Sequence, residues 1–260
     1  MLIVLSPAKK LDYDTPVRTT LDSEPCFLDE AAALIDVLRP LGRSELARLM
    51  KLSDALAGLN VERYQAWTAD TDPSRARQAV LAFNGDVYEG LDAASLSDAQ
   101  LQWAQAHVAI LSGLYGVLRP LDRIQPHRLE MGTRLATARG TNLYQWWGAT
   151  IAEHLNRRLD AVQDGSERVL VNLASVEYFK AVDQSVLDAR VVQCVFEDFS
   201  KGQWKVISFH AKRARGLMAR AIIEERMTAP AAMQGFSSDG YAWAPEVSTP
   251  DRMVFRRAAR

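Results

Sequence analysis

Three segments of the chain place basic side chains directly after a short apolar run and a turn of small residues. They are Leu5 to Lys10, Asn172 to Lys180, and Ser208 to Gly216. Ligands of open α/β sheets collect where strands end, and free backbone N–H groups at the start of a helix attract anions. The chemistry that these residues favour is therefore anion binding, in which lysine acts as a point charge and arginine as a planar fork.

A fourth segment, from Leu111 to Leu135, carries arginines on a stiffened loop. It reads LSGLYGVLRPLDRIQPHRLEMGTRL and contains three glycines and two prolines. Proline fixes φ, so a loop of this kind has less conformational entropy to lose when it holds side chains in place. The arginines of this loop have two interpretations that the sequence leaves open: they bind phosphate, or they pair with the many carboxylates of the chain.

The candidate residues form two sets. The candidates for DNA or phosphate binding share a positive charge: Lys9, Lys10, Arg119, Arg123, Arg128, Arg134, Lys180, Lys212, Arg213, Arg215 and Arg220. A small-ligand pocket at the strand ends would instead add polar groups from Ser6, Asn172, Ser175 and Tyr178. On a helix that starts near His210, Lys212 and Arg215 share a face with the small residues Gly216 and Ala219. We expect these small residues to let a phosphate-bearing ligand lie close.

Motifs of the common enzyme classes are absent. The sequence has no phosphate-binding Gly-x-x-x-x-Gly-Lys-Ser/Thr, no Gly-x-Gly-x-x-Gly after a strand, no Gly-x-Ser-x-Gly and no His-Glu-x-x-His. The four histidines lack metal-ligand spacing, so we predict no metal and no cofactor. These observations favour a protein without catalytic activity but leave an enzyme open.

Composition describes an ordinary globular chain. Its 260 residues are 48% hydrophobic and 24% charged, and the formal net charge is −1. The two cysteines, Cys26 and Cys194, are expected to be free thiols in a reducing compartment. No apolar stretch approaches the length of a membrane span, and Met1 to Leu5 is too short for a signal peptide. We therefore expect a cytoplasmic protein.

Short apolar runs alternate with helical patterns along the chain. The expected strands are Leu2–Leu5, Ala79–Phe83, Val108–Leu111, Arg168–Leu173, a hairpin of Arg190–Phe199 with Gln203–Phe209, and a last strand at Met253–Arg257. The clearest helices are Thr141–Asp160 and a basic helix from His210 to about Met227. This alternation predicts the mixed α/β class: a single compact domain over residues 1–260, with a mixed central sheet flanked by helices.

Several long motifs resemble the YaaA family of bacterial peroxide stress resistance proteins. They are SPAKKLDYDTP, ARQAVLAFNGDVYEGL, the stretch from Leu111 to Leu135, NLASVEYFKAV and ISFHAKRARGLMARAIIEER, and the similarity runs from Met1 to about Trp243. The resemblance implies a cytoplasmic protein that acts during hydrogen peroxide stress, keeps unincorporated iron low and so limits damage to DNA. It also implies a fold outside the common superfolds, with a helix-hairpin-helix element and a basic cleft that bind DNA.

The candidate for the helix-hairpin-helix element lies within residues 44–68. Its core is Leu46 to Trp67, LARLMKLSDALAGLNVERYQAW. The usual hairpin has two glycines around an apolar residue, whereas this segment has only Gly58. The basic face around Lys212 would therefore have to share the binding of DNA.

Two functions remain open from the sequence. The first is a protein that binds DNA, double-stranded or distorted, non-specifically through backbone phosphates. The second is an enzyme or binding protein for a nucleotide or another small phosphorylated molecule. Basic residues that converge in a concave pocket with Asn172 and Tyr178 would favour a small ligand, and a groove wide enough for a duplex would favour nucleic acid. Direct iron sequestration ranks last, since no ligand spacing supports it.

Overall fold

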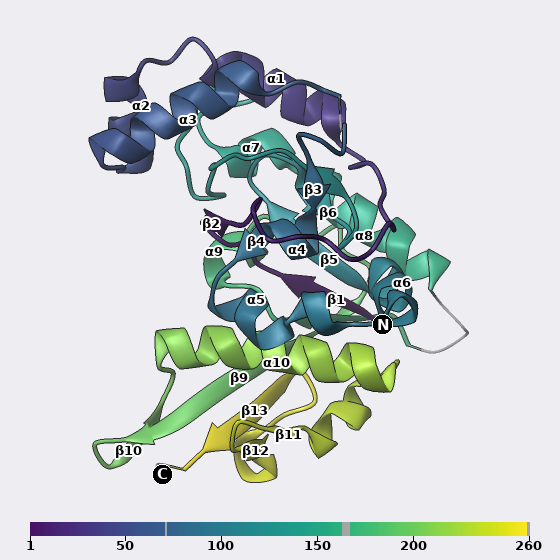
Figure 1. Ribbon diagram of the computed structural model, residues 1–260. Coiled ribbons are helices and arrows are strands. Elements are labelled where there is room, and N and C mark those ends of the chain that lie inside the picture. The colour runs from purple at the N-terminus through teal and green to yellow at the C-terminus, as the bar shows by residue number, and fades with distance from the viewer. Residues whose placement is uncertain (71, 163–166, 259–260) are drawn as a thin grey trace.

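A mixed sheet of nine strands runs through the molecule (Figure 1). The fold is that of a computed structural model, which describes residues 1–70, 72–162 and 167–258. The strands lie in the order β11-β12-β13-β9-β8-β1-β5-β6, and β10 pairs with β9. Their bounds are β1 Leu2–Leu5, β5 Val108–Ser112, β6 Gly116–Leu118, β8 Val169–Asn172, β9 Arg190–Ser200, β10 Gln203–Lys205, β11 Ser237–Ser238, β12 Tyr241–Trp243 and β13 Arg252–Arg257.

The centre of the sheet is parallel. Strand β1 lies between β5 and β8 and is parallel to both, with Ile3 opposite Val108 on one side and Val171 on the other. Strand β9 continues the parallel arrangement from β8 to β13, whereas β6, β10, β11 and β12 add antiparallel edges. Every residue of β1 and β8 is buried, as expected for strands covered on both faces.

Helices and two small sheets surround this core (Figure 1). The helices are α1 Leu28–Leu38, α2 Arg43–Met50, α3 Asp54–Ala66, α4 Ala79–Ala82, α5 Asp86–Leu91, α6 Asp98–His107, α7 Leu143–Trp147, α8 Thr150–Ala161, α9 Val176–Phe179 and α10 Ser208–Glu225. Short 3₁₀ helices occupy Ala93–Ser95, Pro230–Gly235 and Pro245–Val247. The small sheets pair β2 (Lys10–Leu11) with β4 (Phe83–Asn84) and β3 (Arg77–Gln78) with β7 (Arg123–Ile124).

The structure confirms the predicted mixed α/β class with a central mixed sheet flanked by helices. The strands expected at Leu2–Leu5, near Val108 and near Val169 are present, and so is the last strand. The strand expected at Ala79–Phe83 is wrong, because Ala79–Ala82 forms the helical turn α4. A short buried apolar run has the same pattern in a strand and in a helix, so periodicity alone cannot separate the two.

Two other predicted elements differ in their bounds. The helix expected over Thr141–Asp160 is divided into α7 and α8 by Gly148, whose φ of +47° is left-handed. The second strand of the predicted hairpin ends at Lys205, and α10 already begins at Ser208.

The segment proposed as a helix-hairpin-helix element forms two consecutive helices, α2 and α3, joined by a short turn. Lys51 occupies the turn in the left-handed region, with φ of 53°, a conformation that glycine adopts more easily. In Figure 1 the pair lies with α1 at the end of the molecule far from the C-terminal strands. Among the described residues, no helix is both long and apolar enough to cross a membrane.

Candidate functional site

The loops after β1 and β8 meet at a switch point of the sheet. From β1 the chain passes to β5 on one side and later returns to β8 on the other side, so the connections leave β1 in opposite directions. Open α/β sheets bind their ligands in the crevice that such a reversal leaves at the carboxyl ends of the strands. Ser6 and Ser175 are the residues that stand at this crevice.

A cavity of about 450 Å³ lies at this point. Four segments that are distant in the sequence line it: the loop after β1 with the start of β2, the end of β4 with the start of α5, the start of helix α9, and helix α10. Its charged and polar lining residues are Ser6, Lys9, Lys10, Asn84, Asp86, Tyr88, Ser175, Glu177, Tyr178, Lys212 and Arg215. Four of these are cations and two are acids, so the lining is positive overall.

Hydrogen bonds fix the floor of the cavity. The Ser6 hydroxyl accepts a hydrogen bond from the backbone N–H of Ser175 at 2.8 Å, and the Tyr88 hydroxyl donates to the Ser6 carbonyl at 3.1 Å. Asn172 does not line the cavity, but its side-chain oxygen accepts from the N–H of Ala174 at 2.9 Å and shapes the turn before Ser175. The floor is therefore held rigid before any ligand arrives.

Arg215 is the cation most distinctive of the site. Its Nε is buried without a hydrogen-bond partner among the described residues, and no described carboxylate forms an ion pair with it. Burial lowers the pKa of its guanidinium, although arginine stays charged throughout the physiological range. Arg215 is partly buried and has no counter-ion among the described residues, so an anion bound in this cavity would be stabilised by it.

The other three cations of the lining are Lys9, Lys10 and Lys212. Lys10 is exposed on β2, where it pairs in register with Asn84, and Lys212 is exposed one turn before Arg215. Lys9 is bound to Glu130, with Nζ and Oε2 at 2.7 Å. Burial alone would raise the pKa of Glu130, but its hydrogen bonds to Lys9 and Arg128 lower it, so this carboxylate holds Lys9 as an anion.

Four charged or polar lining residues were not singled out from the sequence: Asn84, Asp86, Tyr88 and Glu177. Asn84, Asp86 and Tyr88 come from the segment FNGDVY, and burial raises the pKa of the Tyr88 hydroxyl. Burial raises the pKa of Tyr178 as well, so both phenols stay protonated and can donate hydrogen bonds. The signal available beforehand was the turn Asn84-Gly85-Asp86, which follows an apolar run just as the basic segments do.

The small residues of α10 do not serve a ligand. Gly216 and Ala219 are buried, and a Cβ placed on Gly216 would overlap the carbonyl oxygen of Val87 in α5. Likewise, a Cβ placed on Gly90 of α5 would overlap the carbonyl oxygen of Arg213 in α10. The expectation that these small residues admit a ligand is therefore wrong, since helix α5 fills the space and leaves only Lys212 and Arg215 facing the cavity.

Four predicted arginines are held by carboxylates elsewhere. Arg119 binds the buried Asp122 at 2.9 Å, Arg123 binds Asp22 at 3.1 Å and Arg128 binds Glu130 at 3.0 Å. Arg220 binds Glu224 at 2.8 Å and also donates to the Leu91 and Asp92 carbonyls at the end of α5. Arg119, Arg123 and Arg128 belong to the Leu111–Leu135 stretch, and for these three the interpretation that they pair with carboxylates describes the structure.

Three further predicted cations are exposed outside the cavity. They are Arg134, Lys180 and Arg213, and none forms an ion pair with a described residue. The ammonium of Lys180 lies 5.0 Å from the ring centre of Tyr144. These cations remain accessible to an anion larger than the cavity.

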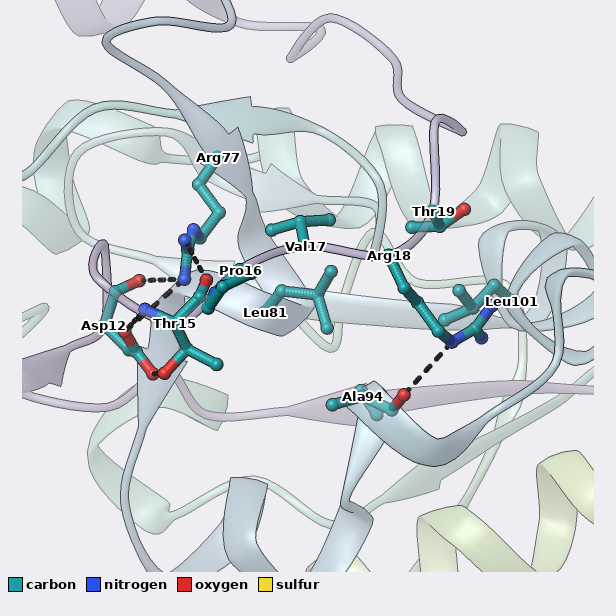
Figure 2. A pocket seen from close by; sticks show the side chains of 11 residues that line it. Asp12, Thr15, Pro16, Val17, Arg18, Thr19, Arg77, Leu81, Ala94 and Leu101 are labelled. Carbon is teal, nitrogen blue, oxygen red and sulfur yellow. Dashed lines mark hydrogen bonds and ion pairs between the residues drawn. The ribbon is translucent and has the colours of Figure 1, made fainter.

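A second hollow, of about 180 Å³, is lined in part by the segment from Asp12 to Thr19, which lies outside regular structure (Figure 2). Its arginines are satisfied by the protein itself. Arg77 donates to the carbonyls of Asp12 and Thr15, and Arg18 donates to the Ala94 carbonyl at 3.2 Å (Figure 2). These contacts tie the segment to the body of the molecule, so this hollow is a less suitable anion site than the cavity at the switch point.

The chemistry available in the switch-point cavity is anion binding and hydrogen bonding. Neither a histidine nor a cysteine is among its lining residues. Throughout the described part of the chain, no group of three or more His, Cys, Asp and Glu side chains is arranged to hold a metal ion. The fold and the site together define an α/β protein with a mainly cationic pocket at its topological switch point.

The sequence profile of the family described as peroxide stress protein YaaA matches residues 1–247, so the chain belongs to this family. It is 62% identical over 259 residues to a UPF0246 protein of Bordetella petrii, with 100% of both chains covered. A UPF0246 protein of Verminephrobacter eiseniae is 62% identical over 258 residues, which cover 99% of this chain and 98% of that one. A UPF0246 protein of Paracidovorax citrulli is 61% identical over 258 residues, which cover 99% of this chain and 98% of that one. The resemblance noted from the motifs is confirmed, and it gives the protein a role in peroxide stress.

Proposed function

We propose that this protein acts in peroxide stress by binding DNA non-specifically, with backbone phosphates held at the switch-point cavity and on the exposed cations around α10. The observation that carries the proposal is the convergence of Lys9, Lys10, Lys212 and Arg215 on one cavity. Lys10, Lys212 and Arg215 form no ion pair with a described residue, so their charge is available to phosphate. Contacts to phosphate give affinity with little choice of sequence.

Binding of this kind would also limit iron-dependent damage. Ferrous iron held by DNA phosphates reacts with hydrogen peroxide beside the strand, and the oxidant formed attacks what is nearest. A protein whose lysines and arginines occupy the phosphates competes with iron for the same sites. We include in this proposal a second, separate surface on helices α2 and α3. Its cations are Arg48, in the last turn of α2, and Lys51, in the turn after α2, and both are exposed.

The test is fluorescence anisotropy of a labelled duplex at about 50 and 200 mM salt. If six or more phosphates are contacted, affinity should fall on the order of a thousandfold across this range. Lys212→Glu should weaken binding, whereas Arg157→Glu changes the net charge equally on the exposed side of α8 and should not. In parallel, the protein should reduce nicking of a plasmid by iron(II) and peroxide, and the Lys212→Glu variant should protect less. Absence of duplex binding at the lower salt would end the proposal.

A small phosphorylated molecule is the second candidate, and the cavity of about 450 Å³ is within the size range of small-molecule sites. Besides cations, the cavity offers Asp86 and Asn84, which suit the hydroxyl or amino groups of a nucleotide. Thermal shift with pyrophosphate and with nucleoside monophosphates tests this candidate, because a ligand at a hundred times its Kd stabilises the fold by about 2.7 kcal/mol. An Arg215→Gln variant that no longer responds would place the ligand in this cavity.

A further inference from the structure

The most exposed aromatic side chains of the described residues gather at the start of α10 and on the preceding hairpin. Phe209 is 59% exposed, Phe199 41% and Trp204 36%. Trp204 stands directly opposite Phe199 in the β9–β10 pairing, and their ring centres are 5.1 Å apart. Figure 1 shows β10 and the start of α10 at the same side of the molecule. We call Phe199, Trp204 and Phe209 the aromatic patch.

Phe209 connects the aromatic patch to the cationic site. Phe209 precedes Lys212 by three residues and Arg213 by four in α10, so the three side chains share one face of the helix. Lys212 also lines the switch-point cavity. A ligand that places a phosphate on Lys212 therefore has the ring of Phe209 one helical turn away.

The charges around the aromatic patch are cationic. Lys201, Lys205, Lys212 and Arg213 form no ion pair with any residue that the structure describes. The neighbouring acids are already neutralised: Glu197 binds Arg256 at 3.0 Å, and Asp198 binds Arg257 at 2.7 Å. A partner for this surface must combine flat apolar groups with regularly spaced negative charges.

Unpaired nucleotides have this chemistry. Their bases stack on exposed aromatic rings and their phosphates bind the adjoining lysines, whereas the bases of an intact duplex are stacked on one another and are not free to do so. Resting on the proposed DNA binding, we propose that the aromatic patch is a base-stacking platform, on which Phe209 first and the Trp204–Phe199 pair next receive the bases of a single-stranded segment. The protein then binds a DNA strand with unpaired bases more tightly than phosphates alone explain.

Three labelled probes of equal length separate the contributions. They are an oligothymidine strand, an abasic strand with the same phosphates, and a duplex. The parent protein should bind oligothymidine more tightly than the abasic strand by roughly five- to a hundredfold, the range of one stacked base. Phe209→Leu keeps an apolar side chain but removes the ring and should reduce this preference by at least about fivefold, the loss of one stacked base, while Phe209→Tyr should retain it.

The matched controls identify which idea fails. Val17→Ala removes exposed apolar surface far along the chain, at a residue 37% exposed, and should leave all three affinities unchanged. Lys212→Glu should weaken all three probes together. Equal binding of the oligothymidine and abasic strands beside intact duplex binding overturns the platform and leaves the proposed function standing. No binding of any probe overturns both, and a parent dimer that Phe209→Leu converts to monomer would assign the patch to a second copy of the chain instead.

Discussion

At the scale of single residues, one histidine ties the stability of the fold to pH. His127 is buried in the Leu111–Leu135 stretch, with Nδ1 2.8 Å from the Gln125 carbonyl and its ring 5.2 Å from that of Tyr115. Burial lowers the pKa of His127 to about 4 from an ordinary value of 6.5. The folded protein therefore keeps this imidazole neutral at a pH where the unfolded chain already binds a proton.

The stabilising effect of a neutral His127 is complete above pH 6.5 and is lost as the pH falls from there toward 4. By linkage, the loss from this residue reaches about 2 kcal/mol near pH 5. We predict that the free energy of unfolding, measured by urea denaturation, falls more between about pH 7.5 and 5 in the parent than in His127→Gln, by roughly this amount. Burial also lowers the pKa of His154 to about 4, so the free energy of unfolding should still fall somewhat as the pH falls in both proteins. Parallel slopes would contradict the prediction.

Residue-level inference from the sequence predicted some of the residues that line the switch-point cavity. Ser6, Lys9, Lys10, Ser175, Tyr178, Lys212 and Arg215 do converge on one cavity. Arg119 and Arg220 carry the same charge and stand in equally suggestive motifs, yet Asp122 and Glu224 bind them. A sequence shows which side chains can bind an anion, but the carboxylate that competes for each one is brought near only by the folded chain.

At the scale of elements, the crossing of α5 and α10 depends on two glycines. A Cβ on Gly216 would overlap the Val87 carbonyl of α5, and one on Gly90 would overlap the Arg213 carbonyl of α10. The helices therefore touch backbone to backbone, and α10 also carries Lys212 and Arg215, which line the cavity. The periodicity of α10 predicted its basic and apolar faces, but small residues serve a close helix contact and a bound ligand equally well, so the identity of the neighbour could not be predicted.

We predict that Gly216→Ala destabilises the protein by about 3 kcal/mol, the scale of overpacking a tight contact. In an uncrowded helix the same change would be stabilising by up to about 1 kcal/mol, so the sign itself is informative. Gly235→Ala is the matched control, because nothing lies within 4 Å of a Cβ built there. Thermal unfolding of both variants measures the effect, and a Gly216→Ala protein as stable as the Gly235→Ala one would mean that the helices separate without cost.

At the scale of the whole molecule, the alternation of strands and helices was enough to predict the class but not the order of the strands. Strand β13 lies parallel to β9, in register from Arg252 opposite Gln193 to Arg257 opposite Asp198. Nothing local to either strand specifies a partner so distant along the chain, since pairing is decided by the apolar surface that both bury. The net charge of −1 is equally uninformative about a site whose cations are concentrated by folding.

The same sheet connects the C-terminal strands to the rest of the molecule. Strand β9 pairs with β8 on one side and with β13 on the other, and α10 packs against both α5 and β9. The C-terminal strands below α10 in Figure 1 therefore cannot leave without exposing the apolar faces of Phe196 and Phe255, which stack with ring centres 5.4 Å apart. A chain of this length often unfolds in steps, but an element shared by both parts couples them.

We predict that native-state hydrogen exchange in rising denaturant brings peptides from β1 and from β13 to the same free energy and the same midpoint. The control is a peptide from the segment Thr15–Thr20, outside regular structure and largely exposed, which should exchange by local opening at a much lower free energy. If β13 exchanged at a lower free energy than β1 while both depended on denaturant, the C-terminal strands would form a separate cooperative unit. Lys212 and Arg215 would then lie at the interface between two cooperative units. Anion affinity would in that case depend on the free energy of separating the two units, and both would have to be measured together.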